Sequence, residues 1–173
     1  MDDAAVLAAQ IGRPLRSSAE VVARCHLDLP VVMKVPPLLD DGTPFPTTYW
    51  LSCPLAVRRI GRVESAGGVR AMERRALADT AFGTALEEAH VRYRSERDAL
   101  VPDGTEPRPS GGVAGVRTGV KCLHAHYADH AAGNENPVGE VTTPWVEPLD
   151  CAMPCVVEVA EGVELNRRWT EPR

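Results

Sequence analysis

The sequence predicts an α+β fold, in which a small antiparallel N-terminal sheet packs against four or five helices in a single domain. Short β-branched runs bounded by turn residues occupy the first third of the chain, and segments with helical periodicity follow them. A chain of 173 residues, of which 44% are hydrophobic, has the length and composition for one domain with one core. We expect the globular domain to span residues 10–158 and residues 159–173 to form a polar C-terminal tail.

Two runs predict the strands of the sheet. Val31–Val35 is apolar and β-branched and ends at two prolines, and Thr47–Leu51 is rich in residues that favour strands. Between them, Asp41-Gly42 followed by prolines is a turn signal, so the two runs are expected to form a hairpin with a long connection. Cys155–Val159 is a further short β-branched run and predicts a last strand.

Helices are predicted for the middle of the chain. Pro54 suits the first turn of a helix, where its missing N–H costs little. Apolar residues recur at helical spacing from Phe82 to Leu100, and Asp79 or Thr80 is the expected cap of that helix. Three further helices are expected at 69–77, 120–132 and 141–146.

The charge pattern excludes a large surface for binding nucleic acid. The chain has 19 basic and 24 acidic residues, for a net charge of -5, and the excess of acids lies from Asn134 onward. A chain whose main part carries no net charge and whose C-terminal part is acidic lacks the basic surface that binds DNA or RNA. No apolar run approaches the roughly 18 residues of a membrane helix, and the acidic start lacks the basic residues of a signal peptide. We therefore expect a cytoplasmic protein with no nucleic-acid or membrane partner, whose partner is an unidentified small molecule or protein.

Four cysteines separated by 28, 69 and 33 residues are the leading candidates for a metal site. No local zinc-finger spacing occurs among them, so only the fold can bring them together. In a reducing cytoplasm, cysteines are thiols or ligands rather than disulfides, and thiolates with imidazole suit soft metals. Zinc is the expected cofactor, and an iron–sulfur cluster is the second choice. The candidate ligands are Cys25, Cys53, Cys122, Cys155 and a histidine, either His126 or His124, with Cys151 treated as spare.

Cys122 has a second interpretation, as the nucleophile of a metal-free enzyme with His124 or His126 as its base. Lys121 precedes it, and the glycine-rich segment 110–115 lies upstream. On a helix Cys122 and His126 share a face, whereas in an extended segment all three side chains share one side. A buried structural cysteine is an equally ordinary explanation, because free cysteines are commonly buried.

Several runs are specific enough to indicate a family. They are Gly42-Thr43-Pro44-Phe45-Pro46-Thr47, Lys121-Cys122-Leu123-His124-Ala125-His126, Asn136-Pro137-Val138-Gly139 and Pro154-Cys155-Val156. Together they resemble a bacterial family, typical of actinobacteria, known as domain of unknown function 501. The resemblance covers about residues 10–158 and implies that the candidate cysteines and histidines lie in family motifs, although the run after Cys25 lacks the glycine that the family tends to carry before its proline.

The resemblance supplies no activity. The genes of the family often lie near those for enolase, a septum-formation initiator and an exopolyphosphatase. This neighbourhood suggests a third class of function, a protein-interaction module linked to cell division or envelope regulation.

Overall fold

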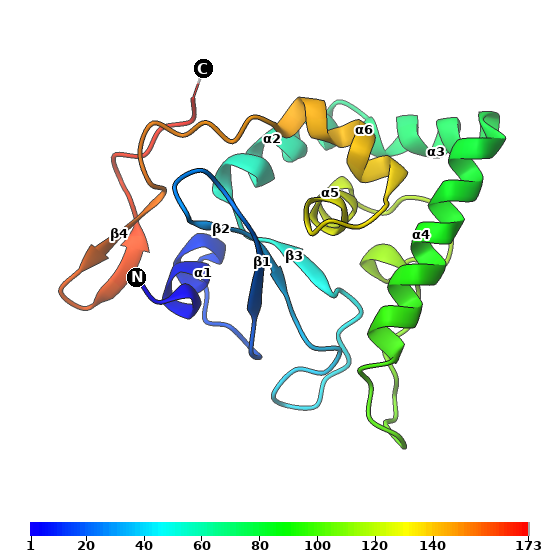
Figure 1. Cartoon of the computed structure of the whole chain (residues 1–173), viewed down its shortest axis with the longest axis horizontal. Helices are drawn as coiled ribbons and strands as arrows, with labels where there is room; N and C mark the ends of the chain where they lie inside the picture. Colours follow the sequence, from blue (N-terminus) through cyan, green and yellow to red (C-terminus); the bar gives the residue numbers. More distant parts are fainter. Residues whose placement is uncertain (173) are drawn as a thin grey trace.

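A three-stranded antiparallel sheet near the N-terminus confirms the α+β prediction (Figure 1). The computed structural model describes residues 1–172. The strand order is β1-β2-β3, with β1 at Glu20–Arg24, β2 at Pro30–Lys34 and β3 at Tyr49–Leu51. The central strand β2 is buried along nearly its whole length, as its β-branched sequence predicts. The first strand was not predicted, because it is only partly buried and carries charged residues at both ends.

Six helices accompany the sheet, and their starts follow local chemistry. Pro54 begins α2 with its missing N–H in the first turn, as predicted. Asp79 caps α4 by accepting a hydrogen bond from the backbone N–H of Phe82, 3.1 Å away. The helices are α1 (Asp3–Ile11), α2 (Pro54–Ser65), α3 (Gly68–Ala78), α4 (Thr80–Asp98), α5 (Leu123–Ala131) and α6 (Pro137–Val146), with a short 3-10 turn, η1, at Val113–Gly115.

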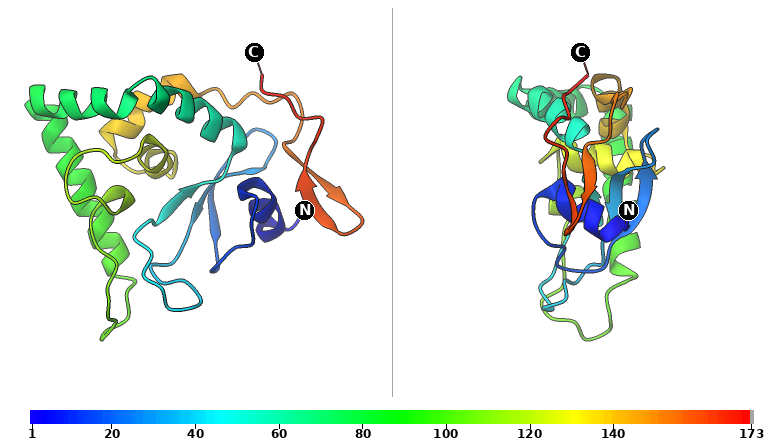
Figure 2. Two further views of the ribbon diagram at one scale, coloured as in Figure 1. Left: turned by 180° about the vertical axis from the view of Figure 1, so that it is seen from behind. Right: turned by 90° about the vertical axis from the view of Figure 1, so that its left-hand side faces the viewer.

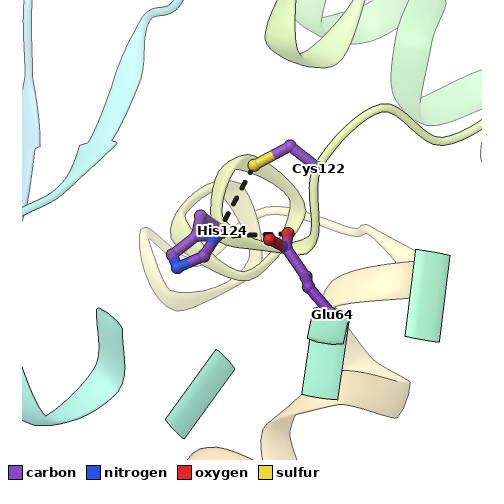
Figure 3. A group of neighbouring side chains, drawn as sticks. All are labelled: Glu64, Cys122 and His124. Atoms are coloured by element: carbon purple, nitrogen blue, oxygen red, sulfur yellow. Dashed lines mark hydrogen bonds and ion pairs between the residues drawn. The ribbon is translucent and has the colours of Figure 1, made fainter. Parts of the chain in front are cut away.

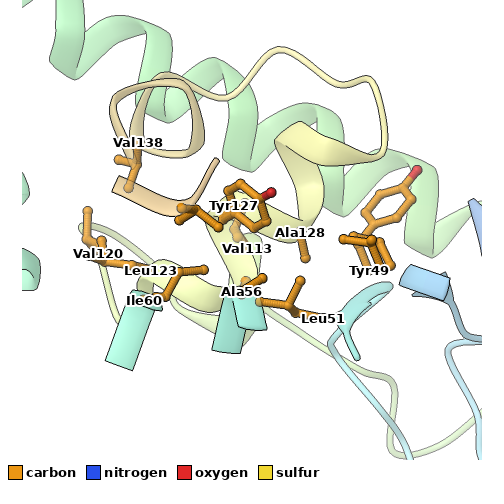
Figure 4. Packing of buried hydrophobic residues seen from close by; sticks show 14 of the residues in the cluster. Tyr49, Leu51, Ala56, Ile60, Val113, Val120, Leu123, Tyr127, Ala128 and Val138 are labelled. Atoms are coloured by element: carbon orange, nitrogen blue, oxygen red, sulfur yellow. The ribbon is translucent and has the colours of Figure 1, made fainter. Parts of the chain in front are cut away.

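The core lies around α5, which is surrounded by the sheet edge and the helices α2, α4 and α6 (Figure 1). Six of the nine residues of α5 are buried. Leu123 and Tyr127 meet Ile60 of α2 and Leu51 of β3 in the main hydrophobic cluster (Figure 4). A fully buried Leu or Ile contributes about 1.5–3 kcal/mol to folding, so these contacts fix the position of α5 and of the residues at its start.

Two polar contacts tie the long helix α4 to the rest of the core. The hydroxyl of Tyr93 accepts hydrogen bonds from the backbone N–H groups of Thr48 and Tyr49, at 2.6 and 3.3 Å. The guanidinium of Arg92 lies 2.5 Å from the fully buried carboxylate of Asp129 on α5. A buried carboxylate needs such a partner, so α4 and α5 are linked by charge as well as by packing.

The segments before residue 10 and after residue 158 also contain regular structure that contacts the rest of the described chain. The helix α1 starts at Asp3, ahead of residue 10, and buries Val6 and Leu7. A hairpin of β4 (Val156–Val159) and β5 (Gly162–Leu165), which extends past residue 158, lies beside α1 (Figure 2). The polar composition of this tail concealed the apolar side chains that hold it, because single apolar residues in a polar segment give no periodic signal.

None of the helices within residues 1–172 combines the length and apolar character that crossing a membrane requires.

Candidate metal centre

Three side chains from two helix ends meet beside the start of α5. They are Glu64 in the last turn of α2, Cys122 at the N-cap of α5 and His124 in its first turn. His124 Nδ1 lies 3.7 Å from Cys122 Sγ and 3.2 Å from Glu64 Oε1 (Figure 3). Within residues 1–172, this is the one group of three or more acidic, cysteine or histidine side chains whose ligand atoms all lie within 4.8 Å of one another.

The start of α5 decides which histidine faces Cys122. Cys122 has extended backbone angles, φ −158° and ψ 124°, so the helix begins only at Leu123. The helical alignment of Cys122 with His126 therefore does not form, and His124 turns back toward the sulfur instead. The Cys122 side chain leaves the helix end uncapped, and Glu64 Oε1 accepts the backbone N–H of Leu123 at 2.6 Å in its place.

The ring orientation of His124 is fixed by the backbone of α2. Its Nε2 lies 3.2 Å from the carbonyl oxygen of Val57, which can only accept, so Nε2 carries a proton. Burial opposes a charged ring, but the hydrogen bond with Cys122 and the charge of Glu64 together raise the pKa of His124 to about 9. When its second proton is lost, Nδ1 presents a lone pair toward Cys122 Sγ and Glu64 Oε1.

Two of the three separations between these donors are close to those around a single tetrahedral zinc ion. With zinc bonds of about 2.3 Å to sulfur and about 2.1 Å to nitrogen or oxygen, tetrahedral angles place nitrogen about 3.6 Å from sulfur and about 3.4 Å from oxygen. The observed separations are 3.7 and 3.2 Å. The Nε2–H bond to a backbone carbonyl is the outer contact that orients a metal-binding histidine.

A large cavity opens beside this group. Its volume is about 850 Å³, and Cys122 and His124 form part of its wall, whereas Glu64 lies behind them. Most of the remaining wall comes from the end of α1, the strand β3, the start of α2 and the segment after β5, and Ala114 and Cys155 also contribute to it. A cavity of this size holds a small organic molecule, so a molecule bound in it would reach the sulfur and the imidazole.

The predicted cysteine ligands do not meet at one point. Cys25, Cys53 and Cys155 line a second cavity of only about 10 Å³, whereas Cys122 lies at the start of α5 and shares only the wall of the large cavity with Cys155. The fourth cysteine of that cavity is Cys151, which was not among the predicted ligands. No three of the sulfurs in this cavity lie within 4.8 Å of one another in residues 1–172, and all five cysteines are free thiols.

Two thiols of the small cavity are held in the neutral form by burial. Burial raises the pKa of Cys53 to about 11 and also raises that of Cys155. The indole N–H of Trp169 lies 3.4 Å from Cys151 Sγ, and the amide of Gln10 lies 3.6 Å from Cys155 Sγ. These sulfurs therefore act as weak acceptors within a packed apolar cluster.

His126 is a core residue that points away from Cys122. It is completely buried, and its Nδ1–H donates to Asn136 Oδ1 at 3.0 Å. Burial lowers its pKa to about 4, so the ring is neutral at pH 7. The ring of His90 packs edge-on against it, with 5.7 Å between the ring centres. His126 therefore lies too deep in the core to contact Cys122, and of the two candidate histidines it is His124 that lies beside the sulfur.

Comparison with known proteins identifies the family of the chain. The family model described as "Protein of unknown function (DUF501)" matches residues 21–144. The chain belongs to this family. No curated protein and no solved structure matches it. The matched part of this DUF501 chain contains Glu64, Cys122 and His124, whereas Cys151 and Cys155 lie beyond it.

Glu64 is the site residue that sequence reasoning missed. It is one of 24 acidic residues, lies at the polar end of a predicted helix, and belongs to no recognisable motif. Its contact with Leu123 spans 59 positions, so only the packing of α2 against α5 reveals it.

Proposed function

We propose that this DUF501 protein binds one zinc ion through Glu64, Cys122 and His124 and presents it to a small molecule in the adjacent cavity. The observation that carries the proposal is the spacing of the donor atoms: the distances from His124 Nδ1 to Cys122 Sγ and to Glu64 Oε1 are close to two edges of a tetrahedral zinc site, and all three donors lie within 4.8 Å of one another. Three protein ligands leave the fourth position for water or substrate, which is the arrangement of catalytic zinc. Zinc remains the metal of choice because the donors are one sulfur, one nitrogen and one oxygen.

The charges and second contacts of the ligands support this choice. A thiolate and a carboxylate neutralise a divalent ion, and the neutral imidazole adds a third donor. Val57 orients the imidazole through Nε2–H, and Leu123 orients the carboxylate through its backbone N–H. The side chains of Glu64 and His124 are each 26% exposed, so an ion has access to them from solvent.

A metal-free cysteine nucleophile is the second candidate, and the raised pKa of His124 favours it. At pH 7 the His124 ring is positively charged and lies 3.7 Å from the Cys122 sulfur. An imidazolium beside a sulfur at a helix N-terminus is the environment that activates catalytic cysteines. In this alternative, Cys122 Sγ attacks the molecule in the cavity and His124 donates the proton to the leaving group.

Metal analysis of protein purified without a His-tag tests the proposal. We expect about one zinc per chain, which is lost in Cys122→Ser and in His124→Ala and kept in Cys53→Ser and Cys151→Ser. Loss of the metal in the Cys53 and Cys151 variants, with retention in the Cys122 variant, would place the ion in the small cysteine cavity and overturn the proposal. A protein without metal that is alkylated selectively at Cys122 near neutral pH would support the nucleophile instead.

A further inference from the structure

The wall of the large cavity is strongly basic, although the chain as a whole carries a net charge of -5. Arg13, Arg58, Lys121 and Arg167 line it, and no aspartate or glutamate does. They come from four separate segments: the residues after α1, the first turns of α2, the loop before α5 and the segment after β5. The fold thus brings together at one cavity four positive charges that are spread over more than 150 positions of the sequence.

These four cations have no acidic partner in the described part of the chain. No carboxylate oxygen of residues 1–172 lies within 4.0 Å of any of them. In contrast, seven other arginines each have such a partner: Arg16, Arg24, Arg59, Arg62, Arg75, Arg92 and Arg97. Glu171 acts on Arg58 from a longer distance, but none of the four cations has a directly paired carboxylate, so the cavity attracts an anion.

Aromatic rings hold two of the arginines in position. The guanidinium of Arg13 lies 5.6 Å from the ring centre of Trp50, and that of Arg58 lies 4.7 Å from the ring of Trp169. Stacking orients a guanidinium and leaves its N–H groups free for a ligand. Both tryptophans also line the cavity, so the wall offers flat apolar surface beside the positive charge.

We infer that the cavity binds an organic phosphate, with its phosphate groups held by the cations and its apolar part against the tryptophans. Four cations suit a ligand that carries at least two negative charges, and planar guanidinium groups match phosphate oxygens in pairs. The volume of about 850 Å³ accommodates such a molecule whole. This inference rests on the proposed function in one respect: the organic phosphate would reach the zinc ion where Cys122 and His124 form the cavity wall.

Tryptophan fluorescence measures this binding directly, because Trp50 and Trp169 line the cavity. The probes are ADP, which has phosphates and a flat ring, adenosine, which lacks the phosphates, inorganic pyrophosphate, which lacks the ring, and citrate, which carries carboxylates instead. In metal-free protein we expect ADP to bind at least tenfold more tightly than pyrophosphate or citrate, and adenosine not to bind. The affinity for ADP should fall as salt is raised, because ion pairs at an open cavity are screened.

Variants of the exposed cations assign the binding to this cavity. Arg58→Ala and Arg167→Ala should each weaken ADP binding about tenfold or more without loss of folding, because both side chains are exposed. Arg70→Ala is the matched control, since Arg70 is an exposed arginine of α3 without an ion pair and outside the cavity. Equal affinity for adenosine and ADP, stronger binding of citrate, or an equal effect of the Arg70 variant would each overturn the inference.

Repeating the titration with zinc present separates this inference from the proposed function. Binding of ADP to metal-free protein that takes up no zinc would sustain the phosphate site and overturn the metal centre. Uptake of zinc by a protein that binds none of the probes would sustain the metal centre and overturn the phosphate site.

Discussion

The carboxylate of Glu64 accepts a hydrogen bond from the backbone N–H of Leu123, 2.6 Å away. This bond joins the last turn of α2 to the first residue of α5, and it supplies the cap that the Cys122 side chain does not provide. The same carboxylate oxygen lies 3.2 Å from His124 Nδ1. Glu64 therefore has a structural role and a chemical role, and a substitution that keeps the oxygen but removes the charge separates them.

Glu64→Gln is expected to weaken zinc binding at least about tenfold while leaving the fold intact. The amide oxygen still accepts the Leu123 N–H, so the metal-free protein should remain folded, and its free energy of unfolding at pH 7 should fall by about 1–2 kcal/mol because the charged His124 loses its carboxylate partner. Zinc affinity is measured by competition with a chelating dye, and stability by urea unfolding. Glu87→Gln on the exposed face of α4 is the control, and equal zinc affinity in both variants would contradict the role of Glu64.

The same variant changes the titration of His124. Without the charge of Glu64, the pKa of His124 should fall below about 9, while the hydrogen bond with Cys122, which raises that pKa more strongly, remains. The raised pKa means that the charged His124 ring stabilises the folded protein. This contribution to the free energy of unfolding is fully present below about pH 6.5 and is lost as pH rises through about 9. The stability difference between wild type and Glu64→Gln should therefore be largest at pH 6 and disappear by pH 10. NMR titration of the imidazole in metal-free protein follows the pKa directly.

Much of the fold follows from local sequence chemistry. The β-branched run after Pro30 forms the buried central strand, and Pro54 and Asp79 start their helices as predicted. These features depend on residues within a few positions of one another, so they are visible without the tertiary structure. The candidate site is different, because Glu64 meets Leu123 only through packing of helices far apart in the chain.

The residue at which α5 begins determines whether His124 or His126 lies beside Cys122. Both histidines were candidates, because either a helix or an extended segment was compatible with the run from Cys122 to His126. The helix begins at Leu123, so Cys122 lies outside it and His126 turns into the core. Helix starts are uncertain by one or two residues in any sequence-based prediction, and here that uncertainty exchanges one histidine for the other.

The five cysteines should differ sharply in reactivity in the metal-free protein. Cys122 lines the large cavity beside a charged imidazole, so iodoacetamide at pH 7.5 should modify it first. Cys53 and Cys155 should react more than about 100-fold more slowly, because burial raises the pKa of both thiols and shields them. Peptide mapping by mass spectrometry gives the order in which the cysteines are modified.

Two controls test the role of Cys122. Zinc should protect Cys122 from modification, and His124→Ala should slow its reaction. Modification of Cys25 or Cys151 before Cys122 would contradict this assignment.

His126 should make the protein less stable in acid. Its pKa is about 4 in the folded protein and about 6.5 when unfolded, so the unfolded chain takes up the proton first as pH falls. Stability is then lost between about pH 6.5 and pH 4, by up to about 3 kcal/mol. Urea unfolding of metal-free protein across this range measures the slope. His126→Asn, which retains a donor toward Asn136, should flatten it, whereas the exposed His26→Asn should not; an unchanged slope in the first variant would assign the acid sensitivity to other groups.

The crossing of α5 and α6 depends on a glycine, and a second glycine provides the matched comparison. A Cβ added at Gly139 of α6 would overlap the carbonyl oxygen of His126 and Cβ of His130, both in α5. Gly139→Ala must therefore push the two helices apart, and we expect it to lower the free energy of unfolding by about 2–3 kcal/mol. Gly61→Ala in α2 adds the same methyl group where no atom lies within 4 Å, and should raise stability by about 0.5–1 kcal/mol. Urea unfolding of both variants measures the contrast, and a similar effect of the two substitutions would mean that α6 does not hold α5, and with it His124, at this distance.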